Sequence, residues 1–124
     1  MTEKKETVVV LGASPKKERY SNQTVCLLAE YGHHVIPVNP AFDTIGGLPA
    51  AHKLSDIKDA IDTITLYISE KVSTSFKDDI LALKPKRVVF NPGAENLPLR
   101  EILDQKGIVT EEACTLVMLK TGQF

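Results

Sequence analysis

Short runs of apolar and β-branched residues alternate along the chain with stretches in which apolar residues recur every three or four positions. Residues 7–11 are almost all apolar and end at Gly12, a pattern that predicts a strand buried on both faces. Helical spacing follows between residues 25 and 29, and Ser21 or Asn22 is placed to cap that helix. The opening unit is therefore a strand, a loop and a helix.

The same alternation continues to the end of the chain. Further strands are expected at 35–38, 63–68, 88–90 and 108–109, and further helices at 55–60, 76–83 and 96–107. Pro85 would stop the second of these helices, and Asn96 would cap the third, with Pro98 in its first turn. Residues 111–119 fit either a helix or a strand.

Strands that alternate with helices at this spacing predict right-handed crossovers and a parallel sheet covered on both faces. A chain of 124 residues has the usual size of one domain. We therefore expect a single Rossmann-like, doubly wound α/β domain over residues 1–124, with a mostly parallel five-stranded sheet.

Composition narrows the possible classes of protein. With 43% hydrophobic and 25% charged residues, neither wholesale disorder nor a fibrous repeat is expected. A net charge of −1 gives little attraction to nucleic acid or to an anionic membrane. No apolar stretch reaches the roughly 18 residues of a membrane span, and residues 1–7 lack the apolar core of a signal peptide, so we expect a cytoplasmic protein.

The cysteines and histidines do not form a recognisable metal or redox motif. Cys26 and Cys114 are far apart in the sequence, and both are expected to be small buried residues. His33 and His34 are adjacent and His52 is isolated, which is not the spacing of a metal site. We predict surface histidines, no metal and no nucleophilic cysteine.

The turn after the first strand has the features of an anion site. In open parallel sheets the ligand lies beyond the carboxyl ends of the strands, near the point where the strand order reverses. Here small residues follow Gly12, and three cations, Lys16, Lys17 and Arg19, precede the helix. Backbone amides at a helix N-terminus, together with such cations, favour a phosphate group.

The missing motifs restrict which phosphate compound is expected. The dinucleotide pattern GxGxxG is absent, since Ser14 stands where its second glycine would be. The second strand ends at Asn39 instead of the acid that would bind an NAD ribose. The P-loop pattern is absent too, so neither plain NAD binding nor nucleotide hydrolysis is supported.

Four short motifs follow one another along the chain. They are Gly12-Ala13-Ser14 with Ser21-Asn22, Val38-Asn39-Pro40, Ile45-Gly46-Gly47 with 54–57, and Asn91-Pro92-Gly93-Ala94-Glu95. In this order and spacing the sequence resembles the small CoA-binding domain proteins, which are similar to the N-terminal domain of the succinyl-CoA synthetase alpha chain. The resemblance covers nearly the whole chain. It implies a module that binds coenzyme A or acyl-CoA without catalysing a reaction.

The resemblance also implies roles for individual residues. The implied pyrophosphate site comprises Gly12, Ala13, Ser14 and Pro15, with Ser21 and Asn22 at the helix start. Val38, Asn39 and Pro40 would line the nucleotide, and Asn91, Pro92 and Gly93 would border the pantetheine route. Apart from the resemblance, the high negative charge of such a ligand favours contacts with the cations Lys16, Lys17 and Arg19, and Tyr20 would stack on the adenine, shield the phosphates or pack over the loop.

Plainer interpretations and other functions remain open. Gly12 to Pro15 also fits an ordinary strand-to-helix turn, Asn91-Pro92-Gly93 fits a type II turn, and charged loop residues are usually solvated. The alternatives are an NADP-dependent reductase, although no Tyr-x-x-x-Lys pair is visible, or a subunit of an acyl-CoA ligase. A third is an interaction protein with an empty pocket. The sequence does not identify a protein partner or an oligomeric state.

Overall fold

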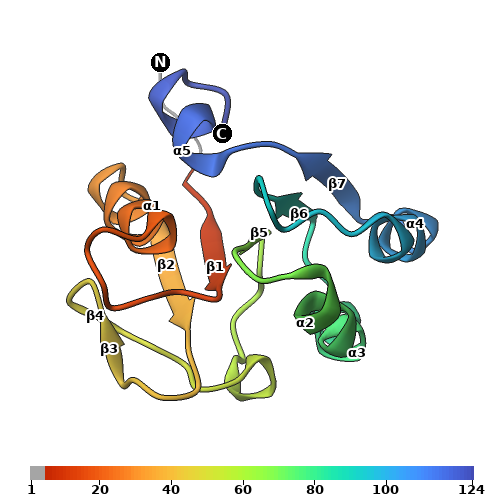
Figure 1. Cartoon of the computed structure of the whole chain (residues 1–124), viewed down its shortest axis with the longest axis horizontal. Helices are drawn as coiled ribbons and strands as arrows, with labels where there is room; N and C mark the ends of the chain where they lie inside the picture. The colour runs from red at the N-terminus through yellow and green to blue at the C-terminus, as the bar shows by residue number, and fades with distance from the viewer. Residues whose placement is uncertain (1–4) are drawn as a thin grey trace.

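A parallel sheet forms the centre of the structure, which is a computed structural model describing residues 5–124 (Figure 1). Its strands are β1 (Thr7–Leu11), β2 (His34–Val38), β5 (Thr63–Leu66), β6 (Arg87–Phe90) and β7 (Val109–Glu112). They pair in the order β2-β1-β5-β6-β7, and every pair is parallel. The predicted doubly wound α/β fold with five strands is confirmed.

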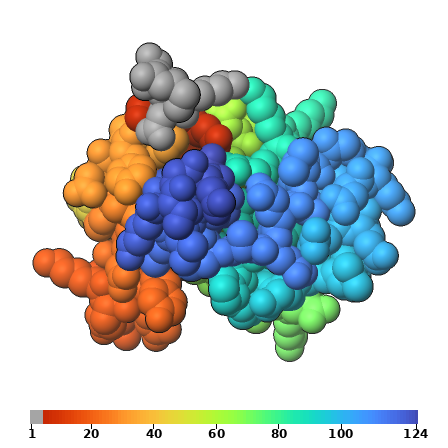
Figure 2. Space-filling model, turned by 90° about the horizontal axis from the view of Figure 1, so that it is seen from above, coloured from red at the N-terminus to blue at the C-terminus, as the bar shows by residue number. Residues whose placement is uncertain are grey.

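Helices cover both faces of this sheet (Figure 1). On one face lie α1 (Tyr20–Glu30) and α5 (Thr115–Lys120), and on the other lie α2 (Glu70–Ser75), α3 (Lys77–Leu83) and α4 (Leu97–Gln105). A short 3-10 segment, η1 (Leu54–Asp56), and a hairpin of β3 (Thr44–Ile45) and β4 (Leu48–Pro49) occupy the connection from β2 to β5. Seen from above, α5 lies beside α1 (Figure 2).

The side chains of β1 contribute to the hydrophobic cores on both faces of the sheet. Val8 and Val10 belong to the core beneath α1 and α5, whereas Val9 and Leu11 belong to the core on the other face. All four side chains are at most 2% exposed, which confirms the prediction of a strand buried on both faces. Burying one such side chain contributes about 1.5 to 3 kcal/mol to stability.

The strand order reverses beside β1. From β1 the chain crosses to β2 on one side, and from β2 it crosses back to β5 on the other side. Leu11, the last residue of β1, is in register with Leu66, the last residue of β5. Because the connections leave these two strand ends in opposite directions, a crevice opens between them, where ligands bind in folds of this kind.

Several elements differ from the expected ones. The expected helix at 55–60 is only the 3-10 segment η1; Leu54 in it and Ile57 directly after it are both buried, three residues apart, which is the period of a 3-10 helix. Helix α2 was not expected, because Val72 is its one large apolar residue and Ser69 alone marks its start as the N-cap. The ambiguous tail is a strand followed by a helix, β7 and α5.

Of the two helix caps expected from the sequence, the one on α4 is present and the one on α1 is not. Asn96 caps α4, since its Oδ1 accepts a hydrogen bond from the Leu99 amide at 3.1 Å. Neither Ser21 nor Asn22 caps α1, which begins at Tyr20 after the N-cap residue Arg19. Both residues lie inside the first turn of α1, and the Asn22 side chain donates a hydrogen bond to the Ser14 carbonyl of the preceding loop.

The cysteines and one histidine also differ from expectation. Cys26 is exposed and Cys114 is partly exposed, so the prediction that both are buried is wrong. Cys26 lies on α1 beside Gly46 of the hairpin, and not against the sheet. His33 is partly buried, and its Nδ1 accepts a hydrogen bond from the Glu6 amide at 3.0 Å. Among residues 5–124 no helix is long and apolar enough to cross a membrane.

One arginine connects the beginning of β6 with both ends of the described chain. Arg87 forms ion pairs with Glu6 at 3.3 Å and with Glu111 at 3.2 Å. Its guanidinium carbon lies 4.4 Å from the ring centre of Phe124, the last residue, and the His33 ring packs edge-on against the same ring. This cluster lies at the amino-terminal edge of the sheet.

Candidate functional site

The turn after β1 depends on a glycine. Gly12 has a φ of +90°, a conformation that L side chains rarely adopt. A Cβ atom there would lie 2.7 Å from the carbonyl oxygen of Tyr67 and 2.7 Å from the side chain of Ile68. The end of β1 therefore passes directly against the end of β5, as the crevice between these strands requires.

Two asparagine side chains hold the loop that follows. The Asn39 side chain donates a hydrogen bond to the Ala13 carbonyl at 2.9 Å, and the Asn22 side chain donates one to the Ser14 carbonyl at 2.9 Å. Ala13 is also fixed through its amide, which donates to the Val38 carbonyl at 3.2 Å. Both carbonyl oxygens therefore already accept hydrogen bonds within the protein.

The first turn of α1 presents free hydrogen-bond donors. The bond from the Gln23 amide to the Arg19 carbonyl, 3.1 Å long, is the first of this helix. Within residues 5–124, the amides of Tyr20, Ser21 and Asn22 meet no acceptor, and the Arg19 side chain forms no cap. Such amides, together with roughly half a positive charge from the helix dipole, make this end attractive to an anion.

A hollow of about 290 Å³ lies beside Tyr20 and Ser21 at this helix start. Its lining residues are Gly12, Ser14, Lys16, Arg19, Tyr20, Ser21 and Tyr67. Residues 15–20 are all exposed, and the segment before α1 protrudes at the lower left of Figure 2. We call this the phosphate hollow, since a glycine turn, two cations and a helix start meet there.

A second hollow, of about 520 Å³, lies on the other side of the helix start. It is lined by Pro15, Lys17, Asn22, Gln23, Cys26, Gly46 and Gly47, and we call it the hairpin hollow. The predicted cations therefore separate, with Lys16 and Arg19 at the phosphate hollow and Lys17 at the hairpin hollow. Sequence spacing alone did not reveal this division.

Tyr67 was not among the predicted site residues. It follows β5 directly and lines the phosphate hollow. Its hydroxyl forms a short hydrogen bond with the hydroxyl of the buried Thr24. Burial raises the pKa of the Tyr67 phenol above its ordinary value of 10.0, which keeps the group neutral beside any bound anion. The signal available in the sequence was a tyrosine at the carboxyl end of a predicted strand.

Asn91 has a structural role under the crevice. It is 2% exposed, and its side-chain nitrogen donates to the Thr65 hydroxyl at 2.6 Å and to the Leu66 carbonyl at 2.8 Å. Its side-chain oxygen accepts the Thr115 amide at 2.8 Å. These bonds fasten β5, β6 and α5 together, so the Asn91 side chain has no donor left for a ligand.

The remaining predicted site residues differ in their exposure to solvent. Pro92, Gly93 and Pro40 are exposed, and Asn39 is partly exposed. Val38 is 3% exposed and packs in the core. The residues Val38, Asn39, Pro40, Asn91, Pro92 and Gly93 line neither hollow.

Comparisons with known proteins agree with this fold. A family of proteins described as "CoA binding domain" matches residues 6–120. An uncharacterized protein of known crystal structure is 40% identical, with a TM-score of 0.92 over 98% of this chain and 100% of its own. The uncharacterized protein YneT of Bacillus subtilis (strain 168) is 23% identical over 105 residues, which are 85% of this chain and 78% of YneT.

A larger protein contains a similar unit. The apo form of the dinucleotide-forming acetyl-coenzyme A synthetase 1 from Ca. Korarchaeum cryptofilum is 26% identical, with a TM-score of 0.68. The match covers 82% of this chain but only 24% of that one.

Proposed function

Because the chain belongs to the CoA binding domain family, we propose that it binds coenzyme A or an acyl-CoA at the crevice between β1 and β5 and does not itself catalyse a reaction. The phosphate hollow would hold the pyrophosphate. The family match supports coenzyme A as the class of ligand, and the residues described above suggest how this chain would hold it.

The observation that carries the proposal is the set of free amides at the start of α1. Tyr20, Ser21 and Asn22 offer these donors beside the turn at Gly12, and the protein supplies no acceptor for them within residues 5–124. A diphosphate provides several strong acceptors at once, and helix N-termini at such turns are common phosphate sites.

The side chains around the phosphate hollow also suit a diphosphate. Lys16 and Arg19 supply positive charge, and none of the lining residues is acidic. The Tyr67 phenol is held neutral, so it adds no negative charge. Exposed ion pairs of this kind contribute about 0.2 to 1 kcal/mol each. The amides and the dipole are therefore expected to provide most of the affinity.

The residues that line the two hollows also support binding without catalysis. Neither hollow is lined by a histidine or by a carboxylate, the groups that most often act as general bases. The nearest candidates for chemistry are Tyr67, whose raised pKa opposes ionisation, and Cys26, whose thiol lies 3.7 Å from the side-chain oxygen of Asn22, an amide and not a base.

A second candidate function is that of a ligase subunit. It rests on the similar unit that makes up 24% of the Ca. Korarchaeum cryptofilum synthetase. In that case this chain would bind CoA in the same crevice and depend on a separate protein for catalysis. ATP-dependent formation of an acyl-CoA, seen only when a second protein is added, would favour this candidate.

The test is a thermal-shift and calorimetric comparison of CoA, dephospho-CoA, NAD and NADPH. A ligand at a hundredfold excess over its Kd should stabilise the native state by about 2.7 kcal/mol. We expect CoA to stabilise the protein most, dephospho-CoA less, and NAD not at all. Stabilisation by NAD or NADPH without an effect of CoA would refute the proposal.

A further inference from the structure

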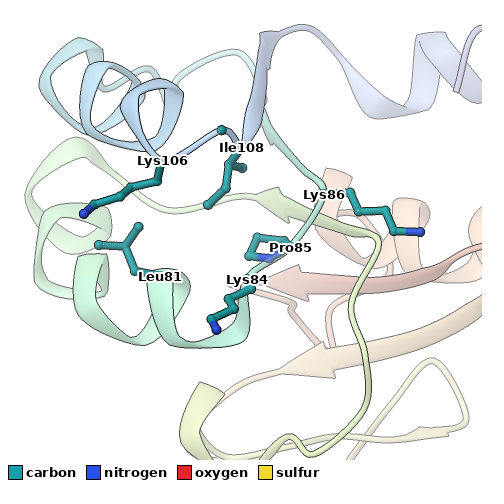
Figure 3. A pocket seen from close by; sticks show the side chains of 7 residues that line it. Leu81, Lys84, Pro85, Lys86, Lys106 and Ile108 are labelled. Carbon is teal, nitrogen blue, oxygen red and sulfur yellow. The ribbon is translucent and has the colours of Figure 1, made fainter.

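A third hollow lies at the opposite end of the sheet from the proposed CoA site. It has a volume of about 560 Å³ and is lined by Leu81, Lys84, Pro85, Lys86, Lys106, Gly107 and Ile108 (Figure 3). We call it the lysine hollow. It sits where β6 and β7 begin, between the ends of α3 and α4, whereas the crevice lies where β1 and β5 end.

The floor of the lysine hollow is apolar. Pro85 is buried, Ile108 is 8% exposed, and Leu81 is partly exposed while packing against the main core. Figure 3 shows Leu81, Pro85 and Ile108 facing the same space from α3, from the segment before β6 and from the segment before β7. An aliphatic chain placed there would cover apolar surface that is now open to water.

Two of the three lysines are available to a ligand. Within residues 5–124, Lys84 and Lys106 have no hydrogen-bond or ion-pair partner for their ammonium groups, whereas Lys86 pairs with Asp62 at 3.2 Å. In Figure 3, the Lys106 side chain passes above Leu81, Lys84 lies on the opposite side of Leu81, and Lys86 points away from the other labelled side chains. Two unpaired positive charges therefore flank an apolar floor.

The backbone offers no further site for an anion here. The Lys84 amide donates to the Leu81 carbonyl at 3.2 Å, the Gly107 amide to Asp104 at 3.0 Å, and the Ile108 amide to Leu103 at 3.1 Å. Recognition of negative charge would thus depend on the two ammonium groups. An inorganic anion would leave the apolar floor unused, and a neutral lipid would leave the charges unused.

We propose that the lysine hollow binds a small monocarboxylate with a linear apolar chain. The carboxylate lies between Lys84 and Lys106, and the chain covers Leu81, Pro85 and Ile108. The volume lies within the usual range for small-molecule pockets, roughly 300 to 1,000 Å³. This site is separate from the CoA crevice and does not depend on the function proposed for it.

The test is a titration of the full chain with hexanoate, followed by amide chemical shifts in NMR. We expect shifts at residues 81–86 and 106–108 and none at the start of α1. Hexanamide, which has the same chain without the charge, should bind about fivefold more weakly, as expected for two exposed ion pairs. Equal binding of the two probes, or hexanoate shifts confined to other residues, would overturn the proposal.

Variants separate the two available lysines from the third. The double variant Lys84→Gln/Lys106→Gln should weaken hexanoate binding about fivefold and leave hexanamide binding unchanged. The matched control Lys86→Gln removes a lysine of the same hollow whose ammonium points away, and it should change binding by less than about twofold. If Lys86→Gln weakens hexanoate binding as much as the double variant does, general surface charge explains the effect and the proposed site does not exist.

Discussion

Gly12 lies so close to Tyr67 that a Cβ atom at residue 12 would be 2.7 Å from the Tyr67 carbonyl oxygen. Gly93 has the same φ of +90°, yet nothing lies within 4 Å of its ideal Cβ position. The two glycines share the left-handed backbone and differ in the space around them. They therefore form a matched pair for measuring what the close approach of β1 to β5 requires.

Gly12→Ala should lower the free energy of unfolding by about 3 kcal/mol, since strain and a clash with backbone atoms add together. Gly93→Ala should lower it by about 1 kcal/mol from strain alone. Urea denaturation with both variants measures the difference. Equal losses would show that the contact with Tyr67 is relieved by a small shift of the strand.

Asn91→Ala should lower the free energy of unfolding by about 3 kcal/mol, because it leaves the buried Thr115 amide and Leu66 carbonyl without this partner. Asn39→Ala is the control, since Asn39 is partly exposed and water can replace its bonds, and about 1 kcal/mol is expected. Urea denaturation again provides the measurement. A loss at Asn91 no larger than that at Asn39 would contradict the structural role given to Asn91.

Tyr67→Phe should change how stability depends on alkaline pH. Because burial raises the folded-state pKa of Tyr67 above 10.0, the unfolded state loses this proton first as pH rises. The contribution of Tyr67 is therefore complete below about pH 10 and is lost as pH rises through the folded-state pKa. Near neutral pH the variant should be about 1 kcal/mol less stable, from the lost bond to Thr24.

The measurement for Tyr67 is urea denaturation at pH values from 7 to 11, and the gap between the two proteins should narrow above about pH 10. Tyr20→Phe is the control for removing a phenol from an exposed position, because Tyr20 is 72% exposed and the variant should leave the free energy of unfolding at pH 7 nearly unchanged. A gap for Tyr67→Phe that stays constant with pH would mean that its phenol ionises as easily in the folded state as in the unfolded one, and a widening gap would mean that it ionises more easily in the folded state.

The division of the cations between two hollows predicts unequal effects on CoA binding. Lys16→Gln/Arg19→Gln should weaken CoA binding about tenfold, since it removes both cations of the phosphate hollow. Lys17→Gln, at the hairpin hollow, should weaken it about threefold or less. Isothermal calorimetry measures both. The reverse order of effects would place the phosphates in the hairpin hollow.

The order of strands and long helices followed from periodicity because β1, β5 and β6 are almost entirely buried and the long helices have an apolar stripe. The position of the candidate site was predicted from the same pattern, since the carboxyl end of β1 is where such folds bind ligands. Helix α2 escaped prediction because its sequence, EKVSTS, has one large apolar residue and no stripe. Its helical conformation depends on the cap at Ser69 and on packing.

Local motifs could not reveal which groups face one another across the sheet. Asn91 looked like part of a ligand route, but its partners Thr65 and Thr115 lie 26 and 24 residues away in the sequence. Tyr67 looked like a strand residue, and only the fold places it beside Gly12 and Ser21. In both cases the deciding contact joins separate strands and helices.

The contacts of Arg87 with Glu6 and Phe124 bring the two ends of the described chain to one place on the surface. A short linker could therefore connect these ends, and the chain could be reopened at an exposed position far from the crevice. Such a circular permutant would keep every strand pairing while changing the order in which the strands are synthesised. It would also allow a fluorescent reporter to be attached away from the proposed CoA site.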